Sequence, residues 1–338
     1  MLHVLVAASA LLPSGMISRV PVKPRVAIAA TSPSPSPPPL PFFLRNAAVR
    51  IGCSSAASAG TWALVRSCGM SSVAASSAIG LAAGAILPTP LATAAFCGTF
   101  VGMSSDLVAP GPADAALLGA AAAALLAALD ASNTRLLKGY GGRLGAVAAL
   151  SCAASMLASP SLRAAGLLMQ PSLALAATAP KALLTTVGAS VAGSAVMRLW
   201  ARRLAVLLIV SSSSSLLAKP TPGEPSKRKE LAKRLSNPVA SASVVGLLAS
   251  AVLGSSRATV AASVFTGAFV AMSAPDKLGS TRSLLGAAAL AGLVQAGLAA
   301  FCVGAGGKLG ASAAIGVLLA RSLRAAAAVV LLWRARAE

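Results

Sequence analysis

Apolar stretches separated by short polar or glycine-containing segments occupy most of the chain after residue 45. A helix that spans a bilayer needs about 20 mostly apolar residues, so these stretches predict an all-α polytopic membrane protein of about ten transmembrane helices. The predicted spans are 68–87, 91–105, 115–134, 143–158, 182–197, 204–217, 238–254, 258–274, 283–303 and 308–320, with further spans beginning near Arg163 and Arg324.

The apolar blocks recur in the same order in the two parts of the chain. "IGLAAGAIL" at 79–87 matches "VGLLASAVL" at 245–253, and "FCGTFVGMS" at 96–104 matches "FTGAFVAMS" at 265–273. The pair "GYGGRLGAVAAL" and "GAGGKLGASAAI" follows in both parts. This collinear order predicts two homologous repeats of roughly 100 residues each. Inverted and parallel arrangements of the repeats both remain open, because the crossings between them cannot be counted from the sequence.

The chain opens with the apolar "MLHVLVAASALLPSG", followed by a basic, Pro- and Ser-rich stretch, and contains no Asp or Glu before Asp106. This composition predicts a cleavable targeting leader, and a plastid membrane is the favoured destination. The mitochondrial inner membrane, a secretory pathway membrane and a Pro-rich tail without an address remain as alternatives. The predicted organisation is a leader at 1–45, repeat 1 at 46–178, inter-repeat transmembrane segments at 179–217, a basic polar linker at 218–237 and repeat 2 at 238–338.

Composition favours the bilayer as the main partner, because 57% of the residues are hydrophobic and only 10% are charged. The net charge of +21 would indicate nucleic acid in a soluble protein. Here the basic residues are spread between apolar runs, where their side chains can reach lipid headgroups, so no nucleic acid partner is expected. The many small residues, with aromatic residues at only 3%, predict close helix packing through small side chains rather than a large aromatic core. They also predict faces through which copies or partner subunits could associate.

The sequence gives no sign of enzymatic chemistry. The five cysteines form no CxxC pair, and the single histidine is His3, inside the predicted leader. No GxSxG motif and no GxxxxGK[ST] phosphate loop is present. We therefore expect no catalytic residues, no metal site and no cofactor.

Acidic residues inside a membrane are costly, so the seven acidic positions are informative. Asp106 and Asp276 follow the matching "FVGMS" and "FVAMS" segments, and could form a pair of carboxylates that binds a cation or a basic group of a solute. Alternatively, each aspartate caps the next element in an interfacial loop. Asp130 lacks a counterpart and is expected to pair with Arg135.

The glycine motifs are the second candidate. Consecutive glycines followed by a helix N-terminus can direct backbone N–H groups at an anion, with a basic side chain beside them. The predicted solute-binding residues are Gly141, Gly142, Gly306, Gly307, Arg143 and Lys308. The alternative is structural, because glycines spaced as GxxxG bring helices into close contact and a glycine turn with a basic residue at the interface needs no ligand.

These observations favour an integral membrane transporter or channel for a small solute, with an anion slightly favoured and the path at the interface of the two repeats. The alternative is a non-transporting scaffold or assembly subunit of an organellar membrane complex. A lipid-handling protein would need a groove open sideways to the bilayer. A polar cavity lined by Arg143, Lys308, Asp106 and Asp276 would favour transport, whereas solid packing with these residues at the water interface would favour a scaffold.

Overall fold

Every secondary-structure element that the computed structural model describes is a helix, so the all-α prediction is confirmed for these residues. The described residues are 40–132, 137–159, 179–217 and 237–337. Residues 1–39 of the predicted leader, most of the predicted linker and the span predicted from Arg163 lie outside them.

The first helix group comprises α2 (Leu40–Ser67), α3 (Ser72–Ile86), α4 (Thr89–Gly102), α5 (Pro112–Ala131) and α6 (Arg143–Ala158). Its helices begin at residues suited to a first turn. The Ser71 hydroxyl accepts a hydrogen bond from the Ala74 amide at the start of α3, and prolines stand in the first turns of α4 and α5, where no N–H partner is needed. Only Leu87 and Pro88 separate α3 from α4, so the apolar sequence there is divided into two short helices.

The second helix group comprises α9 (Pro180–Leu217), α11 (Pro238–Leu253), α12 (Ala258–Ala271), α13 (Pro275–Leu278), α14 (Thr281–Leu298) and α15 (Lys308–Ala337), with the 3-10 turn η1 (Ser255–Arg257) before α12. Gly254 ends α11 with a φ of +63°, a conformation that glycine adopts without steric cost. The chain bends by 111° at this break, so α11 and α12 form a bent pair.

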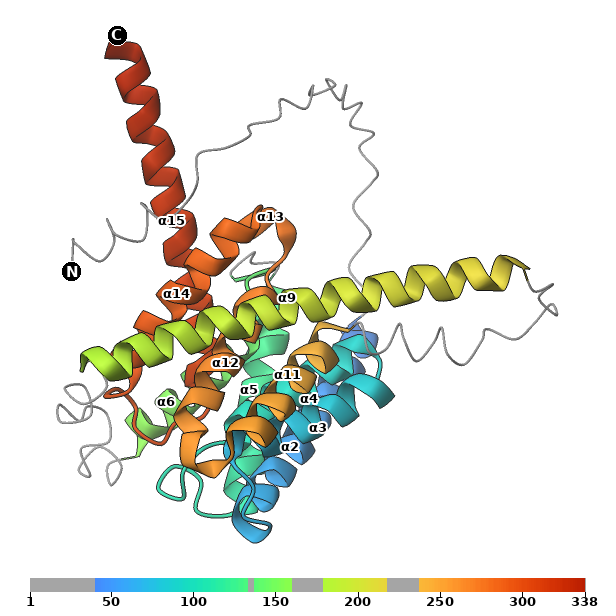
Figure 1. Cartoon of the computed structure of the whole chain (residues 1–338). Coiled ribbons are helices and arrows are strands. Elements are labelled where there is room, and N and C mark those ends of the chain that lie inside the picture. The colour runs from blue at the N-terminus through green and yellow to red at the C-terminus, as the bar shows by residue number, and fades with distance from the viewer. Residues whose placement is uncertain (1–39, 133–136, 160–178, 218–236, 338) are drawn as a thin grey trace. The chain divides into compact units, whose positions relative to one another are not determined.

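In each group one long helix packs on two others, although two repeats are not confirmed by this similarity. In the first group α2 packs on α4 and α5, and in the second group α9 packs on α12 and α14. Figure 1 shows α9 lying across α12 and α14. The groups meet mainly where α3 packs on α11 and where α6 packs on α15. The long helix α2 was not among the predicted spans.

Small residues allow these helices to approach closely. A Cβ atom on Gly98 of α4 would collide with the Ser54 carbonyl oxygen of α2, and a Cβ atom on Gly267 of α12 would collide with the Ser190 carbonyl oxygen of α9. The Ser54 hydroxyl also donates to the carbonyl of Gly119 in α5 at 2.8 Å. Backbone contact and buried hydroxyl bonds of this kind hold apolar helices together where the surroundings are themselves apolar.

Three described helices are long and apolar enough to cross a membrane, namely Pro112–Ala131, Pro180–Ala201 and Lys308–Arg336, and the bent pair α11–α12 would add a fourth. These apolar helices fit a membrane-embedded protein, but ten spans are not confirmed. The reason is that several predicted spans are shorter or merged. The runs at 182–197 and 204–217 both belong to α9, and α3, α4 and α6 are 14 to 16 residues long. At 1.5 Å per residue they fall short of a hydrocarbon core about 30 Å thick.

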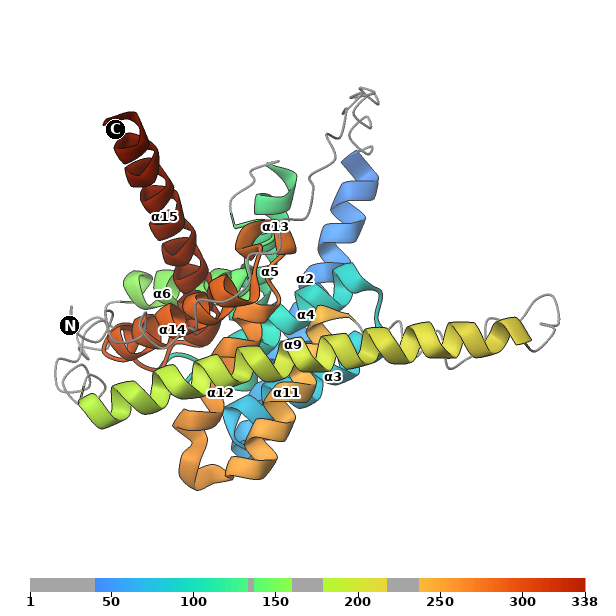
Figure 2. The ribbon, with the colours of Figure 1, turned by 45° about the horizontal axis from the view of Figure 1, so that its top comes forward.

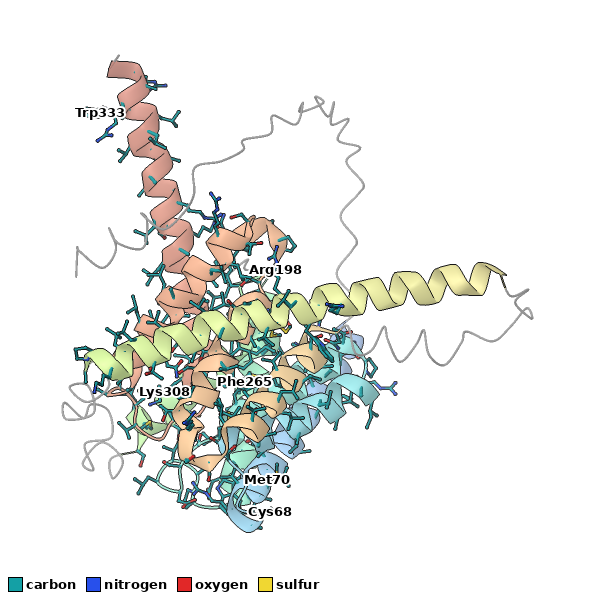
Figure 3. All side chains as sticks on the ribbon, viewed as in Figure 1. Cys68, Met70, Arg198, Phe265, Lys308 and Trp333 are labelled. Carbon is teal, nitrogen blue, oxygen red and sulfur yellow. The ribbon has the colours of Figure 1, made fainter. Side chains whose placement is uncertain are left out.

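The C-terminal part of α15 extends away from the other helices, as Figure 1 and Figure 2 both show. Residues 321–336 are all exposed in the chain, and Trp333 near the end of the helix is 75% exposed (Figure 3). The predicted spans at 308–320 and from Arg324 are therefore parts of one helix, of which only the first part packs within the protein.

Candidate functional site

Four phenylalanines fill the centre of the contact between the helix groups. Phe96 and Phe100 come from α4, Phe265 and Phe269 come from α12, and none is more than 1% exposed. The ring centroids of Phe100 and Phe269 lie 5.1 Å apart with the rings nearly perpendicular, and those of Phe265 and Phe269 lie 4.3 Å apart. Figure 3 shows Phe265 among the helices. Edge-to-face aromatic packing makes the centre a filled apolar core.

Next to the phenylalanines, α3 and α11 cross with glycine against serine on both sides. A Cβ atom on Gly80 would lie 2.5 Å from the Ser243 hydroxyl oxygen, and one on Gly246 would collide with the Ser77 hydroxyl oxygen. Both serines are fully buried, and neither hydroxyl oxygen has a hydrogen-bond partner. The crossing of α3 and α11 therefore combines close contact with two buried hydroxyl groups that lack hydrogen-bond partners. Such groups lower the stability of the folded protein.

Each glycine motif docks on the end of a helix from the other group. The Gly141 amide donates to the Ser273 hydroxyl just after α12 at 2.8 Å, and the Gly306 amide donates to the Ser104 hydroxyl just after α4 at 3.0 Å. The neighbouring backbone bonds are also equivalent. The Ala274 amide donates to the Gly139 carbonyl, and the Ser105 amide donates to the Gly304 carbonyl, both at 2.8 Å.

The glycines that follow these bonds have a steric role. Gly142 and Gly307 adopt φ angles of +85° and +84°, which disfavour any residue with a Cβ atom. One turn further, α6 and α15 cross at Gly145 and Gly310, where a Cβ atom on either would lie 2.6 Å from the Cα atom of the other. Close contacts of this kind are what the structural alternative for the glycine motifs predicts. Solute binding by Gly141, Gly142, Gly306 and Gly307 stays a prediction, and the Gly141 and Gly306 amides already have partners.

Arg143, the first residue of α6, belongs to a cluster of three charged residues that we call the arginine cluster, formed by Arg50, Asp130 and Arg143. The Asp130 carboxylate accepts from a terminal guanidinium nitrogen of each arginine, and both distances are 2.7 Å. Arg50 lies on α2 and Asp130 on α5, so the cluster joins three helices. Arg135, the partner expected for Asp130, lies outside the described residues.

A cavity of about 430 Å³ adjoins the arginine cluster. Arg50 lines it, and the other lining residues come from α2, from the start of α4 and from α5: Asn46, Ala47, Val49, Pro88, Pro90, Leu91 and Ala127. The cavity therefore has an apolar wall with a guanidinium and an amide at its edge.

Lys308, the first residue of α15, lines a second cavity, of about 270 Å³, between α9, α12, α14 and α15 (Figure 3). Its ammonium donates to the Phe301 carbonyl at 3.3 Å, and among the described residues no carboxylate pairs with it. Gln295 lines the same cavity and donates to the Ser263 hydroxyl at 3.2 Å, while its own side-chain oxygen is buried without a partner. A cation at a helix N-terminus opposes the helix dipole, so this position attracts anions.

The two candidate aspartates lie at the surface and have local partners. Asp106 is paired with Arg66 of α2 at 2.7 Å, and its side chain is 60% exposed. Asp276 is paired with Lys277 at 2.7 Å in the short helix α13, and the hydrogen bond from Lys277 lowers the pKa of its carboxyl group. Neither aspartate pairs with Arg143 or Lys308, so the ion pairs do not bring the four predicted charged residues together.

The arginine cluster was missed in the sequence because Arg50 and Asp130 are separated by 80 positions and α2 was not recognised. The only signal was Asp130 itself, an acidic residue late in an apolar run. Within the described ranges, no three His, Cys, Asp or Glu side chains lie close enough together to hold a metal ion.

Comparison of the whole chain with protein-family models, with curated proteins and with solved structures gives no match.

Proposed function

We propose that the chain is a membrane transporter for a small solute, built from two repeats of five corresponding helices with the path between them. The observation that carries the proposal is the reciprocal contact between the groups. Each glycine motif binds a serine after the phenylalanine-bearing helix of the other group. Contacts exchanged in both directions are those of two units related by an approximate two-fold axis.

The contacts of α2 and α9 support repeat bounds that differ from those suggested by the sequence. Because α9 packs on α12 and α14 as α2 packs on α4 and α5, α9 is the counterpart of α2. The proposed repeats therefore comprise residues 40–158 and 180–337, and the segment at 179–217 belongs to the second of them rather than to an insert.

Short and bent helices at the contact between the repeats favour transport over a purely structural role. In transporters built from repeats, interrupted helices meet near the middle of the membrane and form the path. Here the short helix α3 and the bent pair α11–α12 meet at the centre, beside the buried hydroxyls of Ser77 and Ser243. The phenylalanines close the centre, so we propose that this conformation is occluded. The path would open when the groups tilt about the glycine crossing of α6 and α15.

The charges favour an anion as the solute. Arg143 and Lys308 are each the first residue of a helix. Lys308 lines the cavity of about 270 Å³, and Arg143 belongs to the arginine cluster, which adjoins the cavity of about 430 Å³. We keep a plastid membrane as the proposed location, on the composition of residues 1–45 alone.

The scaffold remains a second candidate because of two observations. The contact between the groups is solidly packed at the phenylalanines, and Asp106 and Asp276 are exposed rather than enclosed. The exposed apolar residues of α15, such as Val330 and Trp333, would then contact a partner subunit or lipid.

Uptake into liposomes distinguishes these candidates. Full-length protein would be reconstituted and tested with labelled carboxylates, phosphate, a sugar and an amine. We expect saturable uptake of at least one anion class, reduced by Arg143→Gln combined with Lys308→Gln, with Arg66→Gln as the control. The folded protein could instead give no more uptake of any solute class than protein-free liposomes. That result would exclude transport of these solutes and favour the scaffold.

A further inference from the structure

We propose that the arginine cluster and the adjoining 430 Å³ cavity form a binding site for the carboxylate group of a small molecule. The inference rests on the proposed function, because it assigns a chemical class to the solute. It uses Arg50 and Asp130, which the sequence patterns did not single out as binding residues.

The cluster has an excess of positive charge. Two guanidinium groups share one carboxylate, which leaves one positive charge in a region where Arg50 and Arg143 are only 16% and 18% exposed. A partly buried charge that is not neutralised is costly, and an anion beside it would remove that cost. Asp130 is more exposed than either arginine, at 35%.

The arginines also have unused hydrogen-bonding capacity. Each bond to Asp130 comes from a terminal nitrogen, and the Nε atoms of Arg50 and Arg143 are both buried without a partner. A guanidinium group can present two parallel N–H groups to one carboxylate. In that mode an incoming carboxylate would use an Nε–H group together with the terminal N–H group that now binds Asp130.

The cavity suits a small carboxylate that has an apolar body. Its volume of about 430 Å³ lies in the range of small-molecule pockets. Arg50 would hold the carboxylate, while Pro88, Leu91 and Ala127 would contact the apolar part. Asn46 at the edge adds an amide that can donate to or accept from a second polar group.

Asp130 shows which chemical group the two arginines bind. Its carboxylate already occupies the position between them, and an incoming carboxylate would compete with it for the same N–H donors. Asp130 therefore limits the affinity for a ligand carboxylate, and it returns to both arginines when the ligand leaves. This exchange requires no covalent step.

The test is a calorimetric titration of butyrate into the full-length protein in detergent, which measures the binding affinity. Arg50→Gln is expected to lower the affinity at least tenfold, because one charge-assisted contact is lost. Asp130→Asn is expected to raise the affinity about tenfold, because the competing carboxylate is gone. A variant that merely misfolds cannot produce this gain, so the pair of variants keeps the proposal falsifiable if Arg50→Gln is unstable.

Two controls isolate the charge and the location. Butyramide, the neutral counterpart of butyrate, should not bind measurably, and Arg66→Gln on the same helix should leave butyrate affinity unchanged. A parallel titration with oleate in nanodiscs of neutral lipid identifies the source of the carboxylate. Binding that depends on Arg50 in either arm supports the site, with oleate indicating a membrane lipid and butyrate a free solute.

Equal affinities in the wild type, Arg50→Gln and Asp130→Asn would overturn the proposal, as would equal binding of butyramide. The outcome is separable from that of the uptake experiment. Butyrate binding with the predicted variant effects, but without uptake of any solute, would retain the site and remove the transport function. Uptake of a solute without Arg50-dependent binding of butyrate would remove the proposed site and retain the transport function.

Discussion

The two helix groups share their packing contacts but differ in the charged groups placed beside corresponding helices. In the first group Arg143 is held by Asp130, which also binds Arg50, whereas in the second group Lys308 has only a backbone carbonyl as its described partner. The glycine crossing of α6 and α15 tolerates little change, because a Cβ atom on Gly145 or Gly310 would collide with backbone of the other group. Close packing therefore constrains both groups, whereas the charged side chains beside the cavities differ between them.

The strongest test of the shared packing is truncation of equivalent phenylalanines. Phe100→Ala and Phe269→Ala should each lower the free energy of unfolding by about 3 kcal/mol, because each leaves a cavity in the same core. Phe301→Ala, at a residue that is 45% exposed, should change it by less than about 1 kcal/mol. Unfolding of the purified protein in detergent measures all three. A large loss for one of the central residues and none for the other would show that the groups do not share one core.

The glycine crossing of α6 and α15 gives the next largest effect. Gly145→Ala and Gly310→Ala should each destabilise the protein by about 2 kcal/mol, because backbone rather than a flexible side chain occupies the space. Gly286→Ala is the matched control, since a Cβ atom there has nothing within 4 Å, and it should be neutral or stabilising by up to about 1 kcal/mol. Melting temperatures that fall no more for the crossing variants than for the control would contradict close contact of the helices.

The smallest expected effect comes from the two serines that bind the glycine motifs. Ser104→Ala and Ser273→Ala each leave a buried amide without a partner, so each should cost about 1 kcal/mol. Thr93→Ala, which removes an exposed hydroxyl bonded within its own helix, should cost less than about 0.5 kcal/mol. Hydrogen exchange at the Gly306 and Gly141 amides gives a local readout. Unequal acceleration in the two variants would show that the motifs are not equivalent.

The repeated blocks marked the segments that meet between the groups, but the sequence patterns assigned no role to their phenylalanines and serines. The matching blocks at 96–104 and 265–273 contain the four central phenylalanines and the two serines, and the glycine motifs are the segments that bind those serines. The sequence could not tell that each motif contacts the block of the other group rather than its own. Collinear matches reveal that units are similar, whereas their mutual placement depends on contacts between distant residues.

Helix ends and the arginine cluster were beyond the sequence for different reasons. Hydropathy does not distinguish one long helix from two spans, so the apolar runs within α9 and within α15 were divided. In α2 the residues Arg45 and Arg50 interrupt the apolar pattern, which concealed a helix that carries one of the three residues of the arginine cluster. Because the partner of Arg50 lies 80 positions away, the sequence pattern places a break between apolar segments where the structure has a continuous helix.

If the two groups move against each other to open the path, as we propose, a reversible cross-link between them blocks transport. A Cβ atom on Gly139 would lie 3.2 Å from that of Ala274 in the other group, close to the spacing of about 3.8 Å in disulfides. Gly139→Cys with Ala274→Cys would be introduced after replacement of the five native cysteines, with Gly139→Ala as the control for the strain of a side chain at the φ of +80° there. Uptake into liposomes should cease in the oxidised protein and return on reduction. Equal uptake by the oxidised and reduced forms would contradict the claim.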